Sequence, residues 1–371
     1  MWLNRLKLRN FRNHEDAEVG FAAGLNIITG PNGAGKTNLL EAAQYALCGR
    51  SFRTSREMEM TRQGSSFLRL EARQQSGAGE RDRAVTLAGG EAVRVDSGGG
   101  PRWLEPGMVL CFSPDDLQLI KGAPANRRRY LDEAICCRRP AHRGLALEYQ
   151  KVLSQRNGFL KRARSGYVAP ADIAPWDRQL ASLALQVHAA RLEHCRQLAP
   201  FFQSAWAAIT GKAGEVAIVY DSQLTRLAGR PDAGGQLLAV LAQSRDADMQ
   251  SAATGTGTHR DEIHFLLEGK SLRQFGSQGE QRAAVLSLLL AARGMAEAEG
   301  SPPPVLLLDD VMSELDPDRR RLLLASLAGG QTIITAADSS LFTAAELASA
   351  AVFEIGRGGI EKKPGLEAAI D

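Results

Sequence analysis

The chain has 371 residues, a formal net charge of +3, and 44% apolar and 23% charged residues. These values are ordinary for a globular protein of about two domains. No apolar run reaches the roughly 18 residues that a transmembrane helix needs, so we expect none. The N-terminus alternates apolar and polar residues, as strands do and signal peptides do not. The five cysteines include no C-x-x-C pair, which indicates free thiols in a reducing, cytoplasmic compartment.

The N-terminal part of the chain predicts short strands around one helix. Three alternating or apolar runs lead to a glycine-rich loop, and a helical pattern follows that loop. Further alternating runs, separated by glycine-rich turns, predict an antiparallel meander. The first predicted strand starts at residue 3 and reaches the segment 10–14. The other predicted strands in this part are residues 17–21, 25–28, 67–73, 84–87, 92–95 and 109–112.

The middle of the chain changes to a helical period, and strand patterns return after it. The predicted helices are residues 125–139, 145–163, 176–198, 235–244 and 277–292. Pro200 is expected to end the third of these helices, because proline lacks the N–H that a helix interior needs. The remaining predicted strands are residues 213–220, 263–267, 305–308, 331–335 and 351–355.

The glycine-rich loop has the pattern of a phosphate-binding P-loop between a strand and a helix. Its residues are Gly30, Pro31, Asn32, Gly33, Ala34, Gly35, Lys36 and Thr37. Glycines allow successive backbone N–H groups to point inward, and the helix N-terminus adds partial positive charge. We expect Lys36 to reach the β- and γ-phosphates and Thr37 to ligate Mg²⁺. The alternative is an ordinary glycine-rich turn, but both flanks favour nucleoside triphosphate binding.

Asp309 and Asp310 follow the most apolar run of the chain, residues 305–308. Such a run predicts a buried parallel strand, and ligands of open α/β sheets bind at the carboxyl ends of their strands. We therefore expect Asp309 to hold Mg²⁺. Asp310 stands where hydrolysis needs a base or a water-orienting group, so Lys36 and Asp310 are the candidate catalytic residues.

A third motif lies at the start of the predicted helix 277–292. Ser277 with Glu280 three positions later fits a simple capping box, and also a second anion-binding helix N-terminus. The pattern resembles the signature of ABC-type ATPases, with Ser277, Gly279 and Gln281 at the marked positions, and residues 313–316 resemble their D-loop. The resemblance implies that these signature residues, with Ser313 and Asp316, meet the ATP of a second subunit, so that nucleotide joins two copies.

Residues 126–166 contain eleven Lys or Arg and three Asp or Glu, a balance of +8, so the rest of the chain sums to 3 − 8 = −5. Such a basic segment is either a solvated helix face or a surface for a polyanion. The candidate contacts are Arg127, Arg128, Arg129, Arg138, Arg139, Lys161, Arg162 and Arg164.

Further motifs narrow the resemblance. They are Phe11-Arg12-Asn13 and residues 49–54, 112–117, 121–124, 127–132, 257–262 and 277–282. With these motifs in this order, residues 3–357 resemble the RecF family of bacterial recombinational-repair ATPases, which are relatives of SMC and Rad50 proteins. The resemblance implies that Arg12 and Asn13 contact the nucleotide. It also implies an ATP-dependent homodimer on duplex DNA beside single-stranded gaps, which works with RecR and RecO to load RecA.

The expected fold is α/β: an ABC-type ATPase head, with a mixed P-loop sheet and an antiparallel meander, and an inserted helical lobe. Residues 1–124 and 256–371 would form the ATPase lobe, and residues 125–255 the helical lobe. ATP hydrolysis would be weak, DNA-stimulated and used as a switch. The alternative is the ATPase subunit of an OLD-type nuclease or another SMC-like ATPase. A nuclease of that type requires an acidic metal-binding domain after about residue 330.

Overall fold

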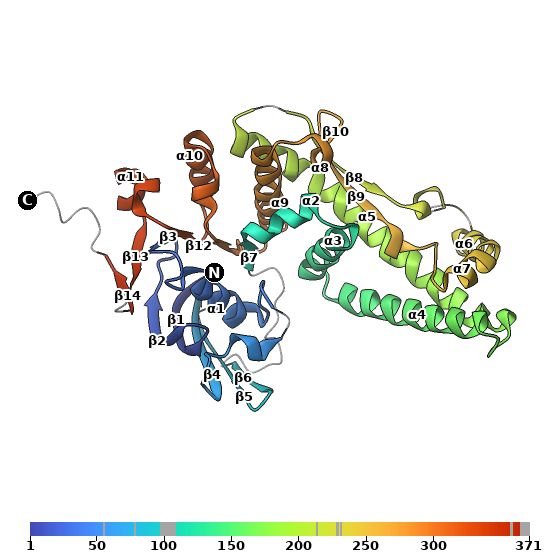
Figure 1. Ribbon diagram of the computed structural model, residues 1–371. Helices are drawn as coiled ribbons and strands as arrows, with labels where there is room; N and C mark the ends of the chain where they lie inside the picture. The colour runs from blue at the N-terminus through green and yellow to red at the C-terminus, as the bar shows by residue number, and fades with distance from the viewer. Residues whose placement is uncertain are drawn as a thin grey trace, which may run out of the picture. The chain divides into compact units, whose positions relative to one another are not determined.

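The computed structural model describes residues 1–54, 56–77, 79–96, 109–212, 214–227, 230, 232–356 and 359–363 (Figure 1). The chain divides into two compact units. The first contains Met1–Asp116, Ala205–Lys212 and Leu286–Asp371, and the second contains Leu117–Ser204 and Ala213–Val285. The division expected from the sequence differs mainly in residues 256–285. These residues belong to the second unit because they include β9, which pairs with β8 in a sheet of that unit.

A six-stranded sheet of order β14-β13-β3-β12-β11-β7 carries the P-loop in the first unit. All neighbouring strands are parallel except β13 and β14, which are antiparallel. The central strands are apolar because they are buried on both faces. The bounds are β3 (Leu25–Thr29), β7 (Val109–Phe112), β11 (Val305–Leu308), β12 (Thr332–Ala336), β13 (Ala351–Gly356) and β14 (Gly359–Lys362).

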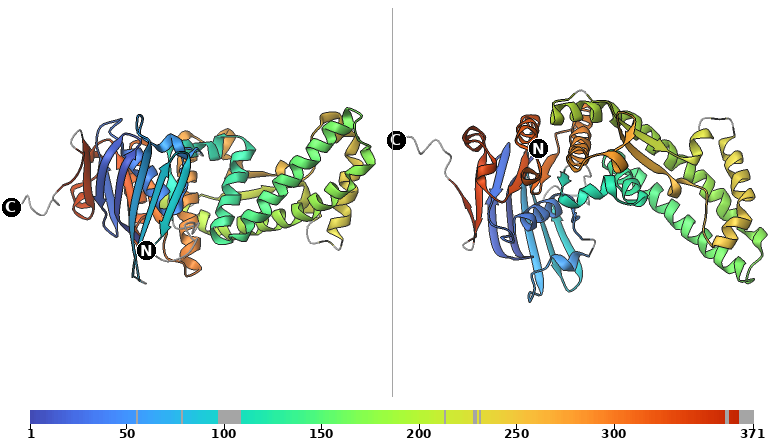
Figure 2. Two further views of the ribbon diagram at one scale, coloured as in Figure 1. Left: turned by 90° about the horizontal axis from the view of Figure 1, so that it is seen from below. Right: turned by 45° about the horizontal axis from the view of Figure 1, so that its top comes forward.

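The meander predicted from residues 67–73, 84–87 and 92–95 is part of a second, antiparallel sheet of order β2-β1-β4-β5-β6, in blue and cyan in Figure 2. Its strands are β1 (Trp2–Phe11), β2 (His14–Gly20), β4 (Phe67–Ser76), β5 (Gly79–Ala88) and β6 (Glu91–Asp96). Helix α1 (Lys36–Cys48) shares one apolar core with strands of both sheets. The buried side chain of Gln331 joins the sheets through hydrogen bonds. Its Oε1 accepts from Leu3 N (2.7 Å), and its Nε2 donates to Leu3 O (2.8 Å) and Ala22 O (2.8 Å).

Helices dominate the second unit. They are α2 (Gln118–Lys121), α3 (Pro124–Arg138), α4 (Ala141–Arg164), α6 (Ala233–Gln243), α7 (Arg245–Ser251) and α8 (Leu272–Phe275), with most of α5 (Ala174–Thr210) and the start of α9 (Gln278–Ala298). Helices α4 and α5 lie side by side and share an apolar core that includes Tyr149, Val152, Leu180 and Val187 (Figures 1 and 2). A small antiparallel sheet contains β8 (Val216–Asp221), β9 (Glu262–Leu267) and β10 (Lys270–Ser271).

The first unit also contains α10 (Pro317–Ser326) and α11 (Ala344–Ala348). Short 3₁₀ helices complete both units: η1 (Glu57–Met60), η2 (Pro114–Leu117), η3 (Pro170–Ile173), η4 (Gln223–Arg226), η5 (Thr258–Arg260), η6 (Val311–Glu314) and η7 (Ser339–Leu341). Ala213, the first residue of the predicted strand 213–220, lies outside the described residues. Within the described part of the chain, none of the helices has the length and apolar character to cross a membrane.

The prediction that Pro200 ends a helix is wrong. Helix α5 continues through Pro200 to Thr210. A proline inside a helix costs about 3 kcal/mol or more, but the helical period of apolar residues does not stop there. Phe202, Trp206 and Ile209 follow at spacings of four and three and are all buried. Burial of these large side chains outweighs the missing backbone hydrogen bond.

Candidate functional site

The P-loop wraps from the end of β3 to the start of α1 through glycines in conformations that other residues rarely adopt. Gly30, Gly33 and Gly35 have φ angles of 149°, 81° and 110°. A Cβ on Gly30 would lie 2.4 Å from the carbonyl oxygen of Ile355, so the loop also needs the missing side chain. The N-cap residue of α1 is Gly35, which has no side chain to cap the helix, and the first turn of α1 has no acidic residue. This helix end therefore presents N–H groups that have no partner within the helix, together with partial positive charge, to an anion.

Lys36 holds a buried ammonium group over the loop. Its side chain donates hydrogen bonds to the carbonyl oxygens of Gly30 (2.6 Å) and Pro31 (3.0 Å). Burial lowers the pKa of Lys36, and the nearby charges of Asp310 and Asp309 partly oppose that shift. Because these hydrogen bonds go to neutral carbonyl groups, they do not neutralise the ammonium charge, which can still attract phosphate oxygens.

Asp309, at the end of β11, lies directly against Thr37 at the start of α1. The Thr37 hydroxyl lies 2.8 and 3.0 Å from the two carboxylate oxygens, and Thr335 Oγ1 donates to Asp309 Oδ1 at 2.7 Å. Burial, helped by the charge of Asp310, raises the pKa of Asp309, while the two threonine hydroxyls oppose this shift. A hydroxyl and a buried carboxylate are hard oxygen ligands, so these residues fit a Mg²⁺ ion, whose charge would offset the burial.

Asp310 occupies a strained position beside this cluster. Its φ angle is 48°, and its backbone N–H donates to Thr335 Oγ1 at 2.9 Å. Its Oδ1 atom is buried and accepts no hydrogen bond from the described part of the chain. Strain and an unsatisfied buried acceptor are both costly and are common at functional sites. The geometry suits a carboxylate that orients a water molecule.

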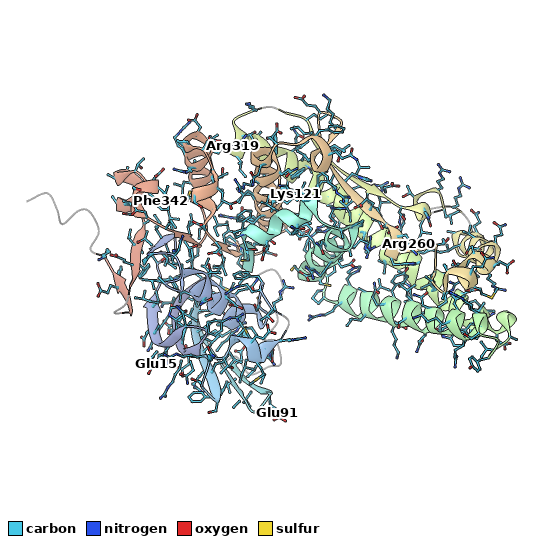
Figure 3. The ribbon with its side chains drawn as sticks, in the orientation of Figure 1. Glu15, Glu91, Lys121, Arg260, Arg319 and Phe342 are labelled. Carbon is cyan, nitrogen blue, oxygen red and sulfur yellow. The ribbon has the colours of Figure 1, made fainter. Side chains whose placement is uncertain are left out.

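The D-loop residues predicted from the sequence are exposed and locally ordered. Ser313 Oγ donates to the carbonyl oxygen of Asp310 at 2.9 Å. Asp316 caps α10 by accepting from the backbone N–H of Arg319 at 3.0 Å, and the Arg319 side chain, labelled in Figure 3, lies 3.4 Å from Asp316 Oδ2. Ser313 and Asp316 are therefore held in fixed positions at the surface of the first unit.

Arg12 and Asn13, predicted to contact nucleotide, lie beside the P-loop in a polar network. Asn13 Nδ2 donates to the carbonyl oxygen of Ala34 at 3.0 Å and its Oδ1 accepts from Asn38 Nδ2 at 2.7 Å. Arg12 makes a bidentate pair with Glu41, at 2.9 and 2.7 Å. An open pocket of about 550 Å³ adjoins the network. It is lined by Arg12, Asn13, Asn38, Arg53, Thr61, Arg62 and Gln63.

Sequence reasoning missed Glu41, which organises this network. Its side chain is fully buried, and besides Arg12 it accepts from Ser51 Oγ at 2.6 Å and from Arg53 Nη1 at 3.3 Å. A single carboxylate within the apolar helical run after the P-loop was the available signal, because charged residues are almost never fully buried unless paired. Ser51 and Arg53 belong to the motif at residues 49–54, which indicates the family but assigns no role to either residue.

The signature residues differ in their accessibility. Ser277 is exposed and precedes α9, and Gly279 is half-buried. The Gln281 side chain is only 4% exposed, and its amide donates to the carbonyl oxygens of Leu272 (2.8 Å) and Gly276 (3.1 Å). Gln281 therefore fixes the signature loop from the inside. Its burial argues against the predicted direct contact with a second subunit.

The basic segment contains both structural and exposed cations. Arg127 is 3% exposed, pairs with Glu262 at 2.6 and 2.8 Å, and donates to three backbone carbonyls of the second unit. Its burial argues against the predicted contact of Arg127 with DNA, because the guanidinium is used inside the unit. Half-buried Arg128 donates to the carbonyl oxygen of Asp261 at 2.7 Å. The exposed members are Arg129, Arg139, Lys161, Arg162 and Arg164.

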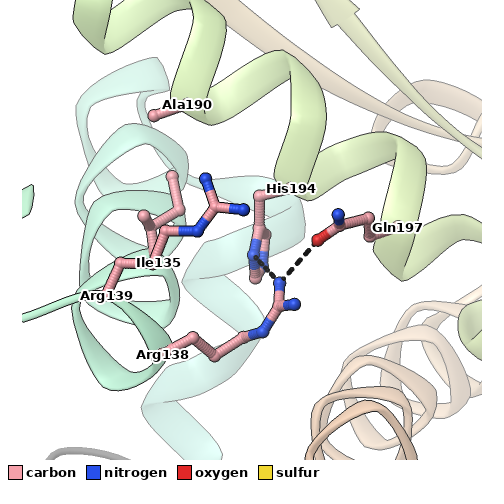
Figure 4. Close-up of a pocket in the computed structure, with 6 residues that line it drawn as sticks. All are labelled: Ile135, Arg138, Arg139, Ala190, His194 and Gln197. Atoms are coloured by element: carbon pink, nitrogen blue, oxygen red, sulfur yellow. Dashed lines mark hydrogen bonds between the residues drawn. The ribbon is translucent and has the colours of Figure 1, made fainter. Parts of the chain in front are cut away.

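Arg138 points into a small pocket between α3 and α5 (Figure 4). Its Nη1 donates to Gln197 Oε1 at 2.9 Å and lies 3.3 Å from His194 Nδ1. Burial, together with Arg138 and Arg139, lowers the pKa of His194 to about 4, so this histidine is neutral near pH 7. Arg138 is thus partly committed to contacts within the unit, whereas Arg139 is exposed.

The P-loop on β3, the buried aspartate at the end of β11 and the serine loop before α9 define an ABC-type ATPase head. An AAA domain family model matches residues 5–102. The fold also resembles an Smc head bound to the C-winged helix domain of ScpA, with a TM-score of 0.57, 14% identity, and coverage of 100% of this chain and 99% of the other.

Full-length relatives identify the family. The chain is 35% identical to the DNA replication and repair protein RecF of Heliobacterium modesticaldum, over 98% of this chain and 99% of the relative. It is 34% identical to the RecF protein of a Synechocystis species, over 98% of each chain. A solved structure described as the recombination mediator protein RecF-ATPrS in the RecFOR pathway has a TM-score of 0.86, 28% identity and 98% coverage of both chains. The chain belongs to the RecF family.

Proposed function

We propose that this protein is an ATP-dependent DNA-binding protein of recombinational repair, in which ATP joins two copies of the chain. The observation that carries the proposal is the cluster of Lys36, Thr37 and Asp309 around the P-loop. Lys36 would bind the β- and γ-phosphates, and Thr37 and Asp309 would hold Mg²⁺, which neutralises phosphate charge when bound. Asp310 would orient the attacking water during slow hydrolysis.

The pocket beside the P-loop supports a position for the rest of the nucleotide. It is an open surface depression, which leaves room for the part of a nucleotide that extends beyond the phosphates. Asn13 connects it to the loop through the carbonyl of Ala34. We infer that Arg12 and Asn13 contact the nucleotide here, and that Thr61, Arg62 and Gln63 adjoin its base and ribose.

A second copy would complete the site. Ser277 and Gly279 would approach the γ-phosphate bound by the other copy, and Ser313 and Asp316 would contact the same interface. The exposure of Ser277, Ser313 and Asp316 supports this proposal. Gln281 would act indirectly, by holding the loop that presents Ser277. ATP would then act as a link between subunits, released by hydrolysis.

The DNA partner is proposed from the family and from the exposed cations. Duplex DNA next to single-stranded gaps would bind through phosphate contacts, with weak sequence preference and strong dependence on salt. Arg129, Arg139, Lys161, Arg162 and Arg164 are the accessible candidates. Cooperation with RecR and RecO in loading RecA is proposed from the resemblance to the family. The descriptions of the solved relatives name a recombination mediator in the RecFOR pathway, which favours repair over an OLD-type nuclease subunit.

The test is the ATP dependence of the oligomeric state, measured by light scattering with Mg²⁺. The unsubstituted chain should become dimeric with ATP. Lys36→Met should abolish the dimer because it removes the phosphate-binding cation. Ser277→Arg should bind nucleotide but remain monomeric, because a bulky side chain replaces the hydroxyl at the interface. An unchanged light-scattering mass of the unsubstituted chain on adding ATP would refute the proposed function.

A further inference from the structure

Ser277 is hydrogen-bonded to the carboxylate of Glu280, which lies in the first turn of α9. The backbone N–H of Ser277 donates to Glu280 Oε2 at 2.7 Å, and the Ser277 hydroxyl donates to the same oxygen at 2.8 Å. In return, the backbone N–H of Glu280 lies 3.3 Å from Ser277 Oγ. This reciprocal arrangement is a capping box. Because an ionised carboxylate can only accept hydrogen bonds, the hydroxyl proton is directed to Glu280.

The same hydroxyl has a second use in the proposed dimer. There, Ser277 would donate its proton to a γ-phosphate oxygen held by the other copy. A serine hydroxyl has a single proton, so Glu280 and the phosphate compete for it. Both groups are anions, and they would lie near each other on the same side of the α9 N-terminus, where like charges repel.

The rest of the loop offers little freedom to avoid this competition. Gln281 holds the carbonyl oxygens of Leu272 and Gly276 from inside the unit, which fixes the backbone on the N-terminal side of Ser277. Helix α9 fixes the other side. The side chains of Ser277 and Glu280 are therefore the groups that must rearrange when a phosphate arrives.

We propose that Glu280 is a positioning residue that keeps the signature serine capped by its own subunit and so raises the ATP concentration needed to join two copies. This inference rests on the proposed function, because it assumes that Ser277 meets the nucleotide of a second copy. It adds a regulatory role for a residue of the signature loop that contacts Ser277 and would not bind the nucleotide itself.

The substitution Glu280→Gln removes the negative charge of the side chain but keeps its size and shape. The glutamine side-chain oxygen can still accept from the Ser277 N–H and hydroxyl, so the cap is kept while the negative charge is removed. Glu346 provides a matched control, because it occupies the same capping-box position in the first turn of α11 in the first unit, with Thr343 as its partner. Glu346→Gln makes the same chemical change at a helix start outside the proposed interface.

The experiment is an ATP titration of dimer formation by light scattering, with nucleotide binding to the monomer measured in parallel. Glu280→Gln should lower the ATP concentration at half-dimerisation about three- to tenfold, while monomer affinity for ATP stays the same and Glu346→Gln behaves as the unsubstituted chain. The difference between Glu280→Gln and the unsubstituted chain should shrink as salt rises, because salt screens exposed like charges. A purely structural cap would show no such salt dependence.

The two proposals fail differently. A dimer that forms in the unsubstituted chain, with the same midpoint in Glu280→Gln, overturns the role of Glu280 alone. A lowered midpoint that does not change with salt also overturns it. Absence of any ATP-dependent dimer, in the unsubstituted chain and in Glu280→Gln alike, overturns the proposed function and this inference with it.

Discussion

Removal of Glu41 should destabilise the first unit substantially. The carboxylate is fully buried and accepts from Arg12 at 2.9 and 2.7 Å, from Ser51 at 2.6 Å and from Arg53 at 3.3 Å. Breaking a buried ion pair from one side costs about 3–5 kcal/mol. The Arg12 and Arg53 side chains are 20% and 40% exposed, so water will partly solvate them, and we expect the lower end, about 3 kcal/mol.

Glu41→Ala should therefore lower the Tm of the first unit by about 6–12 °C, since a unit of this size loses about 2–4 °C per kcal/mol. Calorimetry measures this change. The control is Glu15→Ala, which breaks the pair with Arg62 (2.7 Å), whose side chains are 75% and 37% exposed. An exposed pair is worth about 0–1 kcal/mol, so that Tm should hardly move. Equal losses in the two variants would refute the argument that Glu41 organises the network.

Four further predictions follow from other contacts. Gln331→Leu should cost about 2–4 kcal/mol in urea unfolding, since buried backbone groups of the two sheets lose their partners. Gly30→Ala should abolish ATP binding in a fluorescent-nucleotide titration, because its Cβ would overlap the carbonyl of Ile355. Asp309→Asn should raise the Tm without ligand near pH 7 and remove Mg²⁺-dependent stabilisation. The raised pKa of Asp309 means that its charge destabilises the fold above that pKa, so the gain should disappear on acidification. Arg127→Gln should lower stability but leave the salt slope of DNA binding unchanged, which anisotropy titrations can measure.

Each of these four predictions has a result that would refute it. An unchanged urea midpoint for Gln331→Leu would mean that water replaces its hydrogen bonds. Normal nucleotide affinity in Gly30→Ala would show that the loop adapts. A Tm gain for Asp309→Asn that persists at low pH would exclude a charge effect. A smaller salt slope of DNA binding for Arg127→Gln would show that Arg127 does contact DNA phosphates.

Much of the site was predictable because its signals are local. The P-loop needs glycines and a lysine within eight positions, and a strand and a helix on either side, all of which the sequence displays. The aspartate after the apolar run 305–308 was also predictable, because the carboxyl ends of parallel strands lie at one sheet edge. Its contact with Thr37, 272 positions away, follows from this shared edge.

The expectations from the sequence differ from the structure where tertiary contacts decide the role of a residue. Arg127 has the same local sequence context as its exposed neighbour Arg129, but it is buried and pairs with Glu262, 135 positions away. Gln281 fits a signature pattern, but the fold turns its side chain inward. Pro200 carries a real helix-breaking tendency, which the packing of α5 overrides. In each case a local rule was overruled by tertiary contacts that one sequence does not display.

The central claim is that each nucleotide site is shared by two copies of the chain. It is tested most directly by mixing two variants, each defective in one half of the site. Lys36→Met lacks the phosphate-binding half and Ser277→Arg lacks the signature half. Each alone should remain monomeric with ATP and Mg²⁺ in analytical ultracentrifugation. Their mixture should form dimers, because one of its two sites combines an intact P-loop with an intact signature. A mixture that stays monomeric, under conditions where the unsubstituted chain dimerises, would contradict the shared site.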